Sequence, residues 1–193
     1  MKKTITILAI VLIAFATTTN AQLQRGNVLI GGDLAKFNLG LKKGSTFSMD
    51  ITPKAAWFIK DNLAIGGLVN LNLQTLGEDN GTFFRYSIDA LGRYYVNDPK
   101  VNVLRHGRFF FEGNVGVGGQ NITDGPSTNG LDLGFGPGYA YFITPNIGLE
   151  GLLKYEGFLG FGEAATQSNL TLGVGFQIYL PGRTVKAAAT NTQ

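Results

Sequence analysis

The stretch FSMDITPKAAWFI, residues 47–59, alternates bulky apolar residues with polar or small ones over most of its length. Successive side chains of a β-strand point to opposite faces, so Ile51 and Trp57 share one face while Asp50 and Lys54 share the other. The same two-residue period recurs in segment after segment along the chain. This pattern predicts an all-β protein whose sheet has one apolar face throughout.

The size of the apolar residues predicts which face of that sheet points inward. A barrel of about eight strands encloses room only for small side chains or one small ligand. The Leu, Ile, Val, Phe, Tyr and Trp rows should therefore face outward into lipid, while Gly, Ser, Asn and charged residues line the lumen, as in outer-membrane barrels. The alternative is a soluble β-sandwich that keeps the same aromatic residues in its core.

The N-terminus has the pattern of an export signal. Lys2 and Lys3 precede an apolar run over 5–15, and small residues lead up to Ala21. This arrangement predicts a signal peptide over 1–21 that is cleaved after Ala21. The alternative, an anchor helix, needs about 18 to 20 apolar residues, which is more than this run offers.

The remaining chain divides into alternating segments long enough to cross a bilayer at a tilt, which takes about 9 to 11 residues. We expect an eight-stranded antiparallel up-and-down transmembrane β-barrel over 22–181, followed by a flexible periplasmic tail over 182–193. The expected strands are 27–35, 46–59, 63–75, 83–96, 108–120, 130–143, 147–157 and 168–180. An even number of strands places both chain ends on the periplasmic side.

The connections between these segments support that orientation. Residues 60–62 and 144–146 make tight turns, as expected of periplasmic connections, whereas four longer ones should lie outside the cell. The long connection 97–107 breaks the pattern, because its position in the order makes it periplasmic.

Aromatic residues cluster where the predicted strands reach the periplasmic turns, and similar segments recur there, AWFIKDNLAIGG at 56–67 and AYFITPNIGLEG at 140–151. Aromatic side chains favour the level of the lipid headgroups. The expected periplasmic girdle consists of Trp57, Tyr94, Phe109, Tyr139 and Tyr141. A second girdle near the opposite end is expected from Phe47, Phe84, Tyr86 and Tyr155.

The face opposite the apolar rows collects most ionisable residues of the strands. The expected lumen network is Asp33, Asp50, Lys54, Arg85, Asp89, Arg93, Glu112, Asp132, Glu150, Lys154 and Glu156. Arg93 and Glu112 stand at matching depth on neighbouring strands and should pair, and Lys154 has Glu150 and Glu156 on its own row. Isolated buried charges are costly, so the network predicts a lumen filled by ion pairs. The alternative is a small hydrated, weakly cation-selective pore.

Other chemistry has little support in this chain. Cysteine is absent and His106 is the only histidine, so neither a metal site nor a cofactor is expected. No spacing suggests a catalytic triad, so the protein is not expected to be an enzyme. Removing Lys2 and Lys3 lowers the formal charge of +3 to about +1, which does not indicate nucleic-acid binding.

Together, the leader, the alternating segments and the aromatic turns resemble the OmpA-like and OmpX-like eight-stranded barrels of Gram-negative bacteria. The resemblance covers the mature chain and implies an outer-membrane location. It implies lipid as the surroundings, a monomer, and a possible extracellular partner at the long loops. Those families include anchors, adhesins, small pores and a few lipid-modifying enzymes, so activity stays open. Unlike many of them, this chain continues past Leu180 through Pro181.

Overall fold

The computed structural model of the chain describes residues 23–39, 47–75, 81–97, 106–122, 127–161 and 166–182. They form eight strands: β1 (Val28–Leu39), β2 (Phe47–Lys60), β3 (Leu63–Thr75), β4 (Thr82–Tyr95), β5 (Gly107–Ile122), β6 (Thr128–Thr144), β7 (Ile147–Gly160) and β8 (Gln167–Leu180). The predicted signal peptide lies outside the described residues, as does the predicted tail beyond Gly182. Among the described residues, no helix is long and apolar enough to span a membrane.

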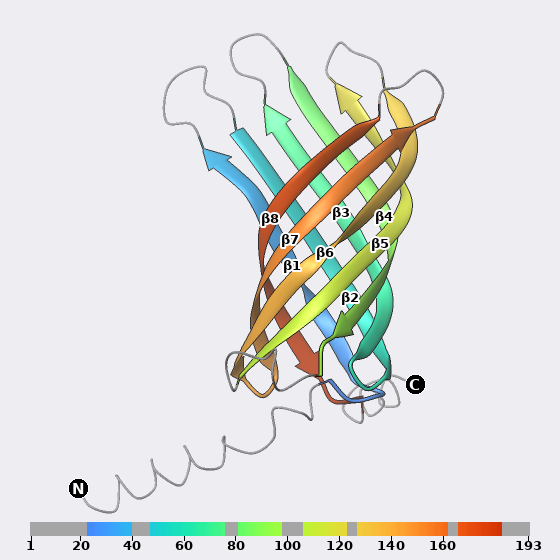
Figure 1. The fold of residues 1–193 in the computed structure, drawn as a ribbon. Helices are drawn as coiled ribbons and strands as arrows, with labels where there is room; N and C mark the ends of the chain where they lie inside the picture. Colours follow the sequence, from blue (N-terminus) through green and yellow to red (C-terminus); the bar gives the residue numbers. More distant parts are fainter. Residues whose placement is uncertain are drawn as a thin grey trace, which may run out of the picture.

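Each strand pairs antiparallel with its neighbours in sequence, and β1 closes the barrel against β8. The closing pairs run from Val28 opposite Leu180 to Ala35 opposite Gly173. The tilted strands form a tall barrel in which the start of β1 and the end of β8 lie at the same end (Figure 1). The predicted eight-stranded antiparallel barrel is confirmed.

Two connections at this end are tight turns, and we call it the turn end. Lys60 pairs with Leu63 across the first turn, where Asn62 adopts a left-handed φ of 65° that asparagine tolerates better than most residues. Thr144 pairs with Ile147 across the second. The connection between β4 and β5 stays long, because β4 ends at Tyr95 and β5 begins at Gly107. The four connections at the opposite end, the loop end, lie mostly outside the described residues.

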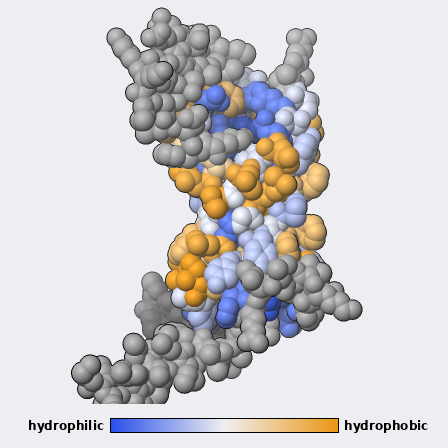
Figure 2. Space-filling model, turned by 60° about the vertical axis from the view of Figure 1, so that its left-hand side comes forward, coloured by the Kyte–Doolittle hydropathy of each residue, from blue (hydrophilic) through white to orange (hydrophobic). Residues whose placement is uncertain are grey.

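The outward face is apolar, as the alternation predicts. On β8, Leu172 and Val174 are 72% and 69% exposed, whereas the intervening Gly173 is buried. Hydrophobic residues gather on the flank of the barrel, and hydrophilic ones gather toward its two ends (Figure 2). An exposed apolar surface of this extent is characteristic of a face that meets a membrane.

The expectation that bulky residues stay out of the lumen is wrong, above all at the turn end. Phe58, Tyr95, Phe110, Phe142 and Tyr179 all point inward there and are at most 4% exposed. We call these five residues the aromatic layer. Glycine makes room for it: a Cβ at Gly138 would lie 2.2 Å from the Phe110 ring. Phe110 therefore fits inside this narrow barrel because the neighbouring strand supplies no side chain at Gly138.

The segment that precedes β1 crosses the turn end and helps to close it. Leu23 is 3% exposed and belongs to the same apolar core as the aromatic layer. Its carbonyl accepts a hydrogen bond of 2.8 Å from the Asn62 amide, and the Gly26 amide donates to the Phe58 carbonyl at 2.8 Å. These backbone bonds fix the segment against the first tight turn.

Candidate functional site: the charged lumen

We call the half of the lumen nearer the turn end the lower lumen and the other half the upper lumen. Glu112 on β5 is the centre of the lower lumen, directly above the aromatic layer. Its carboxylate accepts hydrogen bonds from Lys54 Nζ on β2 at 2.9 Å to each oxygen. Arg93, its partner in register on β4, contacts it through Nε at 3.0 Å and Nη2 at 2.5 Å. Lys154 lies 3.6 Å away on β7. One carboxylate thus connects three cationic groups that come from three strands.

Arg93 links this centre to the far wall and to the aromatic layer. Its Nη1 donates to both oxygens of Glu150 on β7, at 2.8 and 2.7 Å. The same nitrogen donates to the Tyr95 hydroxyl at 3.0 Å, and the guanidinium lies 4.2 Å from the centre of the Phe110 ring. Arg93 is only 1% exposed, so its charge is compensated entirely within the protein.

The hydroxyl groups of the aromatic layer complete the lower network. Tyr179 donates to Glu150 Oε1 at 2.8 Å, and the Tyr95 and Tyr179 hydroxyl oxygens lie 2.8 Å apart. On the adjoining wall, Lys54 Nζ also donates to Asp33 on β1 at 2.5 Å, and Gln177 on β8 donates to the other oxygen of Asp33 at 3.2 Å. The network therefore spans the whole cross-section of the barrel.

The upper lumen holds a second group that contains more amides and fewer cations. Arg85 pairs with Asp132, and its guanidinium lies 4.8 Å from the centre of the Phe158 ring. Asp89 accepts hydrogen bonds at Oδ2 from Asn70 at 2.8 Å and from Asn114 at 3.0 Å. Ser87 donates to the same oxygen at 3.1 Å.

The structure places every residue of the expected lumen network on the inward face, but the partners partly differ from those expected. Arg93 and Glu112 are in contact, as expected from their depth. Lys154 on β7 pairs with Glu112 on β5 over the intervening β6, where Gly136 stands opposite Glu112, since neighbours on its own row are displaced along the strand. Glu156 accepts a hydrogen bond from Thr171 at 3.0 Å, and Asp50 accepts one from Asn72 at 3.2 Å.

Sequence reasoning missed the neutral members of the network. Tyr95, Tyr179 and Gln177 are all at most 1% exposed, and Asn70 and Asn114 bridge the carboxylates. Their parity places them inward, so the signal is present in the sequence. A search restricted to charged residues overlooks them.

Outside the barrel, the expected girdle residues surround the turn end. Trp57, Tyr94 and Tyr141 are 50%, 49% and 42% exposed. Phe109 and Tyr139 are less exposed because their rings pack edge to face, with centroids 4.7 Å apart. Toward the loop end, Phe84 and Tyr86 pack at 5.9 Å. Aromatic rings thus occur outside the wall near both ends.

Comparisons with known proteins give structural likeness only. No family model matches the chain, and neither does any curated protein. Neisserial surface protein A (NspA) has a similar structure, with a TM-score of 0.58, 18% identity and coverage of 79% of this chain and 96% of that chain. The N-terminal β-barrel domain of Pseudomonas aeruginosa OprF gives a TM-score of 0.50 at 17% identity, covering 81% and 98%. The Yersinia pestis outer membrane protein Ail, solved in a bilayer nanodisc, gives 0.47 at 15% identity, covering 79% and 97%.

At such identities the likeness concerns the fold alone. It agrees with what the chain shows by itself: a closed barrel, an apolar outer face and a charged interior. The chain therefore has the fold of the small eight-stranded β-barrels of the bacterial outer membrane.

Proposed function

We propose that this protein is an integral outer-membrane barrel with a structural or interaction role, whose lumen is sealed by its ion-pair network. The observation that carries the proposal is the burial of that network. Arg93, Glu112 and Glu150 are each at most 2% exposed, and the aromatic layer lies directly beneath them. A solute crossing the barrel would have to displace both.

The energetics of buried charges favour a network that stays closed. Separating a buried ion pair leaves an uncompensated charge and costs about 3–5 kcal/mol. Arg93 contacts two carboxylates and Glu112 contacts three cations, so opening the lumen would break several such contacts together. This arrangement supports a rigid, impermeable wall, with contacts to other molecules made at its ends.

Lipid contacts the outward rows, and a monomer is sufficient, because β1 and β8 close the barrel within one chain. An extracellular partner would dock on the predicted outer loops, which lie mainly outside the described residues. Neither catalysis nor nucleic-acid binding is part of the proposal.

A small cation-selective pore is the second candidate, and the upper lumen is what favours it. Glycines such as Gly116 and Gly134 add no side chain to the inner wall there, and the acids of the lumen network outnumber its bases. An acidic section of the lumen would attract cations. The two candidates differ only in whether the lower network and the aromatic layer move aside to let an ion pass.

Conductance in a planar bilayer tests the seal. We expect no single-channel steps from the native protein, because the lower lumen offers no open path. Replacing two inner rings together, Phe58→Ala with Phe110→Ala, should produce steps. The matched control, Phe111→Ala with Phe135→Ala, removes two rings from the lipid-facing side and should stay silent. Reproducible steps from the native protein would instead establish the pore, and a silent inner variant would show that the ion-pair network seals the lumen without the aromatic layer.

A further inference from the structure

The most unusual group in the lumen is the Asp89 carboxylate in the upper half. It is 3% exposed, and its Oδ2 oxygen accepts all three of its hydrogen bonds. The Oδ1 oxygen accepts none, and no cationic side chain of the described residues lies within ion-pairing distance. By contrast, Asp33, Glu112, Asp132 and Glu150 each contact a lysine or arginine.

The position of the free oxygen shows where a ligand would sit. Asp89 is opposite Gly116 on β5, and Gly116 is opposite Asp132 on β6. A Cβ at Gly116 would lie 1.9 Å from Asp89 Oδ1, so this oxygen leans over the glycine toward the strand that carries Asp132. Two carboxylates thus flank a stretch of wall that has no side chain of its own.

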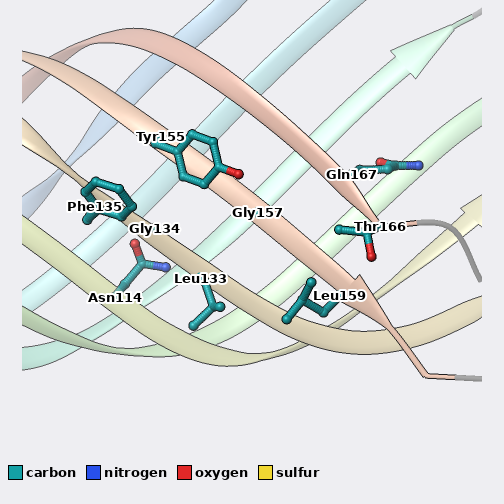
Figure 3. Close-up of a pocket in the computed structure, with 9 residues that line it drawn as sticks. All are labelled: Asn114, Leu133, Gly134, Phe135, Tyr155, Gly157, Leu159, Thr166 and Gln167. Atoms are coloured by element: carbon teal, nitrogen blue, oxygen red, sulfur yellow. The ribbon is translucent and has the colours of Figure 1, made fainter.

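Asn114 supplies a second, independent sign of a missing partner. Its Nδ2 donates to Asp89 Oδ2 at 3.0 Å and to Asp132 Oδ1 at 3.5 Å, but its Oδ1 oxygen accepts no hydrogen bond although the residue is only 7% exposed. That oxygen points toward Gly134, which borders a hollow of about 250 Å³ between β6 and β7 that the outward-facing Phe135 and Tyr155 also line (Figure 3). A buried oxygen without a donor is costly, and here two occur in adjacent residues of one network.

We propose that a monovalent cation, Na⁺ or K⁺, binds in the upper lumen beside Asp89. Oxygen atoms of carboxylates and amides are the ligands that such hard cations prefer. Asp132 is already paired with Arg85, so Asp89 leaves one negative charge without a contacting partner. One monovalent ion balances that charge, with Asp89 Oδ1 as its anchoring ligand.

Unfolding by urea of the detergent-solubilised protein tests this, at constant ionic strength, with NaCl or KCl replaced by choline chloride. Urea is used because guanidinium is itself a cation. A ligand that binds only the folded state at a hundredfold excess over its dissociation constant raises the folding equilibrium constant about a hundredfold. We expect a saturable rise of this kind with Na⁺ or K⁺ and none with choline.

Asp89→Asn should abolish the dependence on Na⁺ or K⁺ and be at least as stable as the native protein in choline, since it removes an uncompensated charge. Asp61→Asn, an exposed acid on the first tight turn, is the control and should keep the dependence. If Asp89→Asn does not fold, broadening of the ²³Na resonance by the native protein, reversed by excess K⁺, replaces that arm. Equal stability in choline and in Na⁺ or K⁺, or an undiminished dependence in Asp89→Asn, would overturn the proposal. Bilayer conductance reports on the seal separately, so either proposal can fail alone.

Discussion

Replacing Glu112 by glutamine is expected to lower the free energy of unfolding by about 3–5 kcal/mol. The reason is the number of cations that this one carboxylate contacts. Lys54 and Arg93 both donate to it, and Lys154 lies 3.6 Å away. A neutral amide of the same shape would leave these groups buried with much less compensating charge. Urea unfolding in detergent micelles, followed by far-UV circular dichroism, measures the change.

The control for this variant is an acid without buried cationic partners. Asp61 is exposed and accepts a hydrogen bond from the Arg25 amide, so Asp61→Asn should change stability by less than about 1 kcal/mol. Equal unfolding curves for Glu112→Gln and the native protein would mean that the lower network does not stabilise the barrel. The proposed role of the network as a rigid seal would then be wrong.

Leu172→Arg is expected to destabilise the barrel by about 2–4 kcal/mol, the cost of a basic residue on the lipid face near the bilayer midplane. Leu172 lies mid-way along β8 and is 72% exposed. If Leu172 faced water, arginine could replace it at little cost in stability. A large loss of stability therefore indicates that lipid surrounds this position. The experiment compares refolding equilibria of the native and variant proteins in phospholipid vesicles.

The position of the arginine along the barrel serves as the control. Thr166 is exposed just before β8 at the loop end, where an arginine should cost no more than about 1 kcal/mol. Comparable effects at both positions, or a negligible one at Leu172, would contradict the predicted depth dependence.

The order of the strands and the face on which each side chain lies could be predicted from this sequence, because the physics behind them is local. Side chains alternate strictly along a strand, so a segment such as residues 47–59 shows both faces at once. The bounds agree closely: the expected strand 63–75 matches β3 at both ends. The larger differences arise at strand ends near the loops, as in β6, which begins at Thr128 where 130 was expected.

The interior was harder to predict because lumen contacts depend on depth and on barrel closure. Arg93 and Glu112 could be paired from the sequence since they are partners on adjacent strands. The contact of Lys54 with Glu112 crosses the lumen between β2 and β5, and no sequence spacing encodes it. The residues of the aromatic layer have inward parity, but the size argument excluded them, because the room for them comes from glycines of other strands, such as Gly138 beside Phe110.

The central claim is that lipid surrounds the outward apolar rows, and tryptophan fluorescence tests it directly. Trp57 is the only tryptophan and is half exposed on the outer wall near the turn end. In vesicles of brominated phospholipids, we expect bromines near the headgroups to quench it more than bromines at the chain ends. For Leu172→Trp in a Trp57→Phe background, we expect the reverse order. Emission from both proteins that ignores bromine at any depth and is quenched by aqueous iodide would show that water, not lipid, contacts this surface.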